Sequence, residues 1–335
     1  MTPIPRKNLM FSEMFGPTAA ENQTAWTRSP KNPILRGDNG TWSRDFIATC
    51  SLVEHKGELR LYAEGSTRAQ EQIGLFTSLA DRLEGPWTPS PVNPILRVGA
   101  AGFDRGGVFD PSVVSFAGRW LMYFSAAEGD AHEYAEQLAH GTTADGPVGE
   151  TIGLAFSDDG VVFDKHPGNP ILHARCPFAL VHDNLVHLFY VQVADGGYRI
   201  HLAVSEDGIG FRPVRPEPVL DVGAPCSWDA CSVTTPKIFR DGDQFCMAYA
   251  GDSASLDDPT GIGLAVSDDL MRWEKIAGNP VFVVGPAGAF DSVSVASPII
   301  RAVEDRYAMV YAGSDRTIRE GLHSQVGLAW LSTAP

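Results

Sequence analysis

One hairpin-like phrase recurs five times along this chain of 335 residues. Each copy predicts a loop, a β-strand, a tight turn and a second strand that contains tyrosine. The copies span residues 41–66, 103–125, 173–193, 227–252 and 289–314. A repeat of this kind indicates that each unit is one supersecondary element and that neighbouring units stack to bury a common core.

Two further phrases accompany each hairpin. An Asn-Pro-Ile-Leu phrase or a close variant occurs at residues 32–35, 93–96, 169–172, 217–220 and 279–282. An Ile-Gly-Leu phrase or a variant begins at Ile73, Ile152, Ile200, Ile262 and Val326. Proline cannot donate to a strand ladder, so the first phrase suits an outer edge. Each unit then has four strands, which predicts an all-β, five-bladed β-propeller with about 67 residues per blade.

The two ends of the sequence carry complementary pieces of this unit. An Asn-Pro-Ile-Leu phrase precedes the first hairpin, and an Ile-Gly-Leu-type phrase follows the last one. We therefore predict that the N-terminal strand completes the last blade and closes the ring. Residues 1–31 are predicted to form a tail, and residues 32–335 a single propeller domain.

Composition limits the partners of the protein. The formal net charge is −15, which argues against nucleic acid and anionic membranes, because both require basic patches. No stretch approaches the roughly 18 apolar residues of a membrane span, and the N-terminus has no apolar run of signal-peptide length. The expectation is a cytoplasmic protein with a small-molecule substrate. The sequence carries no signal for its oligomeric state.

Cysteine and histidine spacing gives no metal signature. The five cysteines show no regular spacing, which favours reduced thiols, although Cys226 and Cys231 lie near enough in sequence to bridge. No Cys-x-x-Cys or His-x-x-x-His pair occurs. No cofactor is predicted, and an axial metal held by oxygen ligands would leave no spacing signature in a repeat protein.

The start of the first strand of each blade faces the central axis. Aligning the repeats on the tyrosines of the second strand places five residues there, namely Thr49, Asp110, Cys176, Thr235 and Ser297. Of these, Asp110 alone is a carboxylate. Six residues earlier, a second column contains Ser43, Asp104, Asp229 and Asp291. A short carboxylate there can cap the turn that enters the strand, which is a structural role.

Other candidates lie outside these columns. Asp45 precedes Thr49 by four residues and has no counterpart in the other repeats. The long loop of blade two, residues 126–150, contains Glu128 and His132. Trp42 and Trp228 can stack on a sugar ring or belong to the core of the repeat. The candidate substrate-binding residues are therefore Trp42, Thr49, Cys176, Trp228, Asp229, Thr235, Asp291, Ser297 and His132.

Specific segments carry a resemblance to a known group. They are Val-Phe-Asp-Pro-Ser-Val at 108–113, Arg-Leu-Glu-Gly-Pro-Trp at 82–87, and the repeated Ser-Asp-Asp-Gly and Asn-Pro-Ile-Leu phrases. With these segments, residues 32–332 resemble the five-bladed propeller glycosidases of glycoside hydrolase families 43, 32, 68, 117 and 130. The family-43 pattern implies a base Asp on blade one, an orienting Asp on blade two and an acid Glu on blade three.

The sequence matches this pattern in part. Asp110, in an Asp-Pro-Ser context, matches the orienting aspartate. Blade one has Thr49 where the pattern has its base, with Asp45 nearby, and blade three has Arg175 and Cys176 where the pattern has its acid. The candidate catalytic residues are therefore Asp45, Asp110, His173, Arg175 and Glu128, of which the last three are candidates for the missing acid.

Two functions remain open. The first is a glycoside hydrolase-like enzyme that acts on a small glycoside or sugar-derived substrate by carboxylate-assisted acid/base catalysis in an axial pocket. The second is a repurposed propeller that binds or transforms a non-sugar ligand without glycosidase activity. The absence of a glutamate at the blade-three position favours the second function. Asp110 on blade two and Asp45 on blade one, each at the start of the first strand of its blade, favour the first.

Overall fold

The computed structural model describes residues 11–23, 25–37, 42–67, 70–128, 150–321 and 323–332. Helix in these ranges is confined to short pieces, η1 (Phe11–Met14), α1 (Ala19–Gln23) and η2 (Ile318–Glu320). Strands make up the rest of the regular structure, so the predicted all-β class is confirmed. No helix of the described residues is long and apolar enough to cross a membrane.

The strands pair in antiparallel groups that follow the sequence repeats. The first two groups are β2 (Phe46–His55), β3 (Glu58–Ser66), β4 (Glu71–Leu79) and β5 (Thr88–Pro89), then β6 (Gly107–Phe116), β7 (Arg119–Ala127), β8 (Glu150–Ser157) and β9 (Asp164–Lys165). The next two are β10 (Arg175–His182), β11 (Leu185–Ala194), β12 (Gly197–Ser205) and β13 (Arg212–Pro213), then β14 (Ser232–Asp241), β15 (Gln244–Asp252), β16 (Gly261–Ser267), β17 (Glu274–Lys275) and β18 (Phe282–Val283).

The last group joins both ends of the chain. It contains β19 (Ser294–Val303), β20 (Arg306–Ser314), β21 (Ser324–Ser332) and the early strand β1 (Trp26–Arg28). β1 pairs antiparallel with β21, with Trp26 opposite Leu331. Phe11 is buried nearby, with its ring 4.6 Å from that of Tyr307. Residues inside the predicted tail therefore contribute both a strand and core side chains to the last group.

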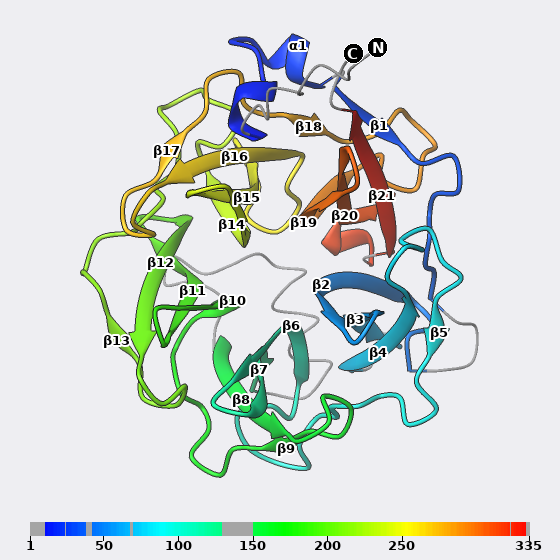
Figure 1. Cartoon of the computed structure of the whole chain (residues 1–335), viewed down its shortest axis with the longest axis vertical. Coiled ribbons are helices and arrows are strands. Elements are labelled where there is room, and N and C mark those ends of the chain that lie inside the picture. Colours follow the sequence, from blue (N-terminus) through cyan, green and yellow to red (C-terminus); the bar gives the residue numbers. More distant parts are fainter. Residues whose placement is uncertain are drawn as a thin grey trace, which may run out of the picture.

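The first strand of each group lies nearest the centre of the molecule (Figure 1). Along the chain, β2 contacts β6, β6 contacts β10, β10 contacts β14 and β14 contacts β19, and β19 in turn contacts β2. Buried apolar side chains fill the space between neighbouring groups, as in the cluster of Phe189 and Tyr198 of the third group with Met247 of the fourth. The core therefore lies between the groups, and their inner strands surround the centre.

The Asn-Pro-Ile-Leu phrase is not a continuous strand, contrary to the sequence prediction. The side-chain amide of Asn93 donates to the Leu75 carbonyl (2.9 Å) and accepts from the Leu75 N–H (2.8 Å). Only Leu96 then makes a β-bridge, to Ile73. The same reciprocal pair forms at Asn32, Asn169 and Asn279. The asparagine side chain thus makes the two hydrogen bonds that the backbone of a paired strand would make, at a point where proline interrupts the pairing.

A β-bulge interrupts each of the five inner strands near its start, and the bulge in β2 is shorter than the other four. The four longer bulges each contain a residue with positive φ. None of these four residues is glycine, and the φ values are 49°, 49°, 46° and 50° at Asp110, Cys176, Thr235 and Ser297. Left-handed backbone is unfavourable for such residues and often accompanies functional positions. The bulge confirms that these four residues occupy equivalent positions.

The tyrosines of the second strand of each group do not all occupy equivalent positions. They therefore do not align blade one correctly with the other blades. Tyr62 and Tyr123 donate to carbonyls of the next group, whereas Tyr249 and Tyr311 donate to aspartates of their own group. Thr49 lies opposite Ala63 as Phe109 lies opposite Ser125. Thr49 therefore precedes the bulged column by one residue, contrary to the sequence alignment.

Candidate active site

The positive-φ residue Asp110 lies within a group of carboxylates at the start of β6. Its backbone N–H, which the bulge frees from the ladder, donates to Glu64 Oε2 at 2.7 Å. Its Oδ2 accepts from the buried Ser125 hydroxyl at 2.9 Å, and the same hydroxyl oxygen accepts from the Cys176 N–H at 2.8 Å. These bonds fix the Asp110 carboxylate and connect three neighbouring groups of strands.

Glu71 and Glu150 add two more carboxylates. They begin β4 and β8 and occupy equivalent positions, each two residues before the isoleucine of the Ile-Gly-Leu phrase. Burial raises the pKa of Glu71 well above its usual value, and repulsion from Glu64, Asp110 and Glu150 raises it further. The nearby Arg175 only partly offsets this rise. Glu71 therefore retains its proton at a higher pH than an ordinary glutamate does.

Arg175 organises the other side of the group. Its Nε lies 3.0 Å from Glu150 Oε2, and its Nη1 lies 2.9 Å from Asp257 Oδ1. The guanidinium carbon is 4.9 Å from the centre of the Tyr198 ring, and Nη1 also donates to the Tyr198 oxygen. Burial alone would lower the pKa of Arg175, but Glu150, Tyr198 and Asp257 outweigh burial and raise it. The cation is therefore permanent and balances part of the local negative charge.

Three of the residues predicted from the sequence, Asp110, Arg175 and Cys176, are thus brought together. Cys176 is buried, and burial raises the pKa of its thiol further above the physiological range. Cys176, Cys226, Cys231 and Cys246 are all free thiols. At the equivalent bulge positions, Thr235 Oγ1 accepts from the Ser297 N–H at 3.1 Å. Thr235 and Ser297 therefore connect the last two groups of strands.

The remaining catalytic candidates lie differently. The Asp45 carboxylate pairs with neighbouring Arg44 at 3.1 Å, and its N–H donates to the Ser66 carbonyl. Ser66 lies opposite Glu71 at the end of the β3–β4 ladder. Asp45 therefore lies at the same end of these strands as Glu71. His173 and Glu128 are exposed. His132 lies outside the described residues, and the side chain of Thr49 is not described either.

The aspartates of the second column are buried, and each pairs with a partly exposed cation. Asp229 is 2% exposed and its Oδ2 is 2.6 Å from Lys275 Nζ. Asp291 is fully buried, with Oδ2 at 2.7 Å from Arg28 Nε. Asp104 forms the same kind of ion pair, with Lys165. In each case the cation comes from an outer strand, so these contacts account for the aspartates without a ligand.

Trp42 and Trp228 pack over glycines of the sheets. A Cβ on Gly74 would lie 2.2 Å from the Trp42 ring, and one on Gly263 would lie 2.6 Å from the Trp228 ring. Trp228 also stacks on Tyr249 with a centroid distance of 5.6 Å. These are the core contacts that the sequence left as an alternative to sugar stacking.

Sequence reasoning did not select Glu64, Glu71, Glu150 and Asp257. A local signal for two of them was present, because Glu-x-Ile-Gly-Leu occurs at 71–75 and 150–154, whereas the other repeats have Tyr198, Thr260 and Ser324 at that position. Glu64 and Asp257 have no such signal. Within the described ranges, no group of three or more His, Cys, Asp or Glu residues is arranged to hold a metal ion.

Comparison with known proteins places the fold in a recognisable group. No protein-family model matches the chain. An uncharacterised protein of Mycobacterium tuberculosis (strain CDC 1551 / Oshkosh) is 28% identical over 252 residues, which cover 72% of this chain and 78% of the relative. This identity indicates common ancestry. Because the relative is uncharacterised, it gives no information about the activity of this protein.

Solved structures share the fold at low identity. A thermostable family-43 glycoside hydrolase has a TM-score of 0.62 at 16% identity, covering 91% of this chain and 96% of its own. A structure from a study of family-130 mannoside phosphorylases and β-1,2-mannosidic hydrolases has a TM-score of 0.68 at 14% identity, covering 92% and 94%. An N-acetylgalactosamine deacetylase from F. plautii, in complex with blood group B trisaccharide, has a TM-score of 0.64 at 16% identity, covering 92% and 96%. The resemblance to propeller glycosidases is therefore confirmed at the level of the fold.

Proposed function

We propose that the protein is a glycoside hydrolase-like enzyme that cleaves a small glycoside or sugar-derived substrate at the Asp110 carboxylate group. The proposal includes a single five-bladed propeller whose ring is closed by β1, with the substrate bound in an axial pocket. The pairing of β1 with β21 and the contact between β19 and β2 support this closure. The fold neighbours described as glycoside hydrolases support the reaction class.

The observation that carries the proposal is the environment of Glu71. Glycoside cleavage requires one carboxyl group that donates a proton to the leaving oxygen and a second that is ionised. Burial and like charges raise the pKa of Glu71, which suits it to the role of general acid. The general acid then lies on the first group of strands. The family-43 pattern instead implies an acid on the third.

Asp110 supplies the ionised partner in this mechanism. The Ser125 hydroxyl and the positive-φ bulge hold its carboxylate in one orientation. Asp110 then accepts a proton from the attacking water, or attacks the sugar carbon directly, while Glu71 protonates the departing oxygen. The Arg175–Glu150 ion pair lies close enough to Glu71 to influence its charge, and Asp45 is a substrate contact at the same end of the first group of strands.

Hydrolysis of a panel of aryl glycosides tests the proposal. Loss of a general acid lowers the rate by about 10²–10⁴-fold, so Glu71→Gln should lose this much activity on substrates with poor leaving groups. Substrates with dinitrophenolate leaving groups need no protonation and should lose far less. Exposed Glu217→Gln is the matched control and should retain full activity. A uniform loss across all leaving groups would refute the role of Glu71 as the acid.

The second function rests on a specific observation at β10. Arg175 and Cys176 occupy the position at which the resemblance implies an acid glutamate, and Arg175 is fully engaged by carboxylates. A propeller that binds or transforms a non-sugar ligand accommodates this change. No hydrolysis of any glycoside, together with saturable binding of a ligand that Asp110→Asn abolishes, would favour this function over the first.

A further inference from the structure

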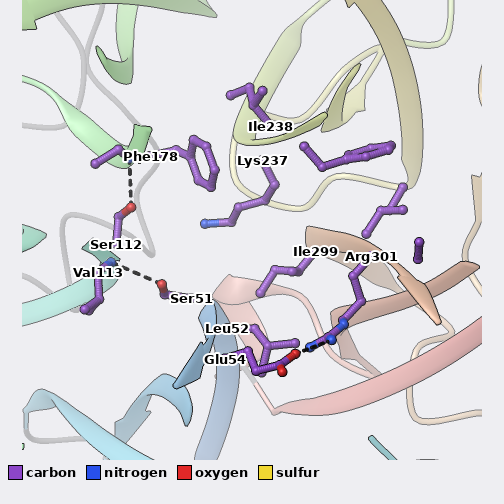
Figure 2. Close-up of a pocket in the computed structure, with 14 residues that line it drawn as sticks. Ser51, Leu52, Glu54, Ser112, Val113, Phe178, Lys237, Ile238, Ile299 and Arg301 are labelled. Atoms are coloured by element: carbon purple, nitrogen blue, oxygen red, sulfur yellow. Dashed lines mark hydrogen bonds and ion pairs between the residues drawn. The ribbon is translucent and has the colours of Figure 1, made fainter. Parts of the chain in front are cut away.

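The inner strands form a second site, beyond the bulges. A cavity of about 380 Å³ is lined by residues of all five inner strands, and it contains none of the carboxylates described above. Figure 2 shows its lining side chains. One ring of equivalent residues consists of the first residue of each inner strand that pairs again after the bulge, namely Ser51, Ser112, Phe178, Lys237 and Ile299. We call this set the inner ring.

Lys237 is the distinctive member of the inner ring. It is only 6% exposed, and its side chain extends into the cavity between Phe178 and the two serines (Figure 2). Its Nζ lies 5.7 Å from the centre of the Phe178 ring. Among the described residues, no carboxylate or carbonyl pairs with this ammonium group. A buried charge without a partner is unfavourable, so the cavity favours the entry of an anion.

The two serines of the inner ring provide hydroxyl donors. Ser51 Oγ accepts from the Val113 N–H at 3.1 Å, and Ser112 Oγ accepts from the Ala179 N–H at 2.8 Å. Each oxygen is thus already an acceptor, which leaves its own hydrogen to donate. No acceptor for either hydrogen occurs in the described part of the chain. An anion next to Lys237 would therefore meet an ammonium and two hydroxyl donors.

The rest of the lining sets the charge and shape of the ligand. Arg301 is paired with Glu54 at 2.7 Å, so among the described lining residues Lys237 is the one uncompensated charge. Leu52, Ile238 and Ile299 present hydrocarbon. A ligand with one negative charge and an apolar body matches this surface, whereas a polyanion would lack the cations that it needs.

We propose that this cavity binds a small organic monoanion, of the class of short branched or cyclic carboxylates. The carboxylate contacts Lys237 and the serine hydroxyls, and the apolar body packs against Phe178 and Ile299. This site is separate from the proposed hydrolytic site and does not depend on it.

Calorimetry and thermal melting with isobutyrate test the proposal. The wild-type protein should bind isobutyrate saturably and melt at a higher temperature in its presence. Isobutyramide, which has the same shape without the charge, should do neither. Lys237→Met retains the apolar stem and should weaken isobutyrate binding by about tenfold or more, because a charge-assisted hydrogen bond is lost. Arg212→Met, on outer strand β13, removes one exposed positive charge and should bind as the wild type does.

Two further arms make the result decisive. Glu71→Gln should bind isobutyrate normally, since the carboxylate group does not line the cavity. If Lys237→Met does not melt cooperatively, Lys237→Gln takes its place. Equal binding of isobutyrate by the wild type and by the folded Lys237 variant would overturn the site, as would no binding by the wild type. Binding of inorganic phosphate but not of isobutyrate would overturn the assigned ligand class.

Discussion

At the scale of single residues, the candidate site depends on electrostatic competition. Glu71 lies near Glu64, Asp110 and Glu150, whose charges raise its pKa, and near Arg175, whose charge lowers it by less. Because like charges cannot all ionise at close range, one carboxyl group retains its proton. The position of Arg175, bonded to Glu150 and Asp257, makes Glu71 the group that retains it.

This competition predicts a pH dependence of stability. The folded-state pKa of Glu71 is raised, so folding favours its protonated form. The corresponding stability is fully present below the unfolded pKa of about 4.3 and is lost as pH rises towards the folded value, by about 1.4 kcal/mol per pH unit. Glu71→Gln stays neutral and should lack this loss. The measurement is urea unfolding of both proteins between pH 4 and 8, and parallel stability curves would contradict the shift.

At the scale of elements, the Asn-Pro-Ile-Leu phrase takes the place of a continuous outer strand in the groups of strands. Asparagine side chains form two hydrogen bonds with the neighbouring strand where proline removes a donor, as at Asn93 and Leu75. The third group differs, since Glu217 stands at this position and Arg215 donates to the Pro218 carbonyl instead. The repeat therefore offers its own internal comparison.

Asn93→Ala should destabilise the protein by about 1–3 kcal/mol, because the substitution leaves the Leu75 N–H without its acceptor and removes one of the two donors to the Leu75 carbonyl. Glu217→Ala, at the equivalent position without this bond pair, should change stability by less than about 0.5 kcal/mol. Chemical denaturation of the two variants measures the difference. Equal effects would show that the amide bonds contribute nothing at the edge.

At the scale of the whole molecule, the early residues hold the last group of strands together. Arg28 on β1 donates to the fully buried Asp291 at 2.7 Å and to the Val283 carbonyl at 2.6 Å. It therefore connects β1 to two groups of strands that are distant from it in sequence. Arg301 and Glu54 form a similar connection between β19 and β2, at 2.7 Å.

Arg28→Met should reduce stability by about 3–5 kcal/mol, because Asp291 is left buried without its cation. Exposed Arg36→Met is the matched control and should change stability by less than about 0.5 kcal/mol. Thermal and denaturant unfolding of both variants provides the measurement. A loss no larger than that of the control would show that β1 is dispensable for the fold.

The repeat, its hairpins and Ile-Gly-Leu strands, and the equivalence of Asp110, Cys176, Thr235 and Ser297 were all predictable from the sequence. These features follow from local patterns, since apolar alternation, turn residues and repeated phrases are each readable within one unit. The alignment failed at Thr49 because one bulge is shorter, and pairing partners rather than sequence spacing reveal this.

Only the tertiary structure decided the composition of the sites. Glu64, Asp110, Arg175 and Asp257 come from separate repeats, and no local pattern records which side chains will meet. The same applies to Lys237, whose position in a strand is ordinary but whose burial beside Phe178 depends on all the inner strands. Charge interactions depend on distance in space, and the arrangement of the five units around one centre sets those distances.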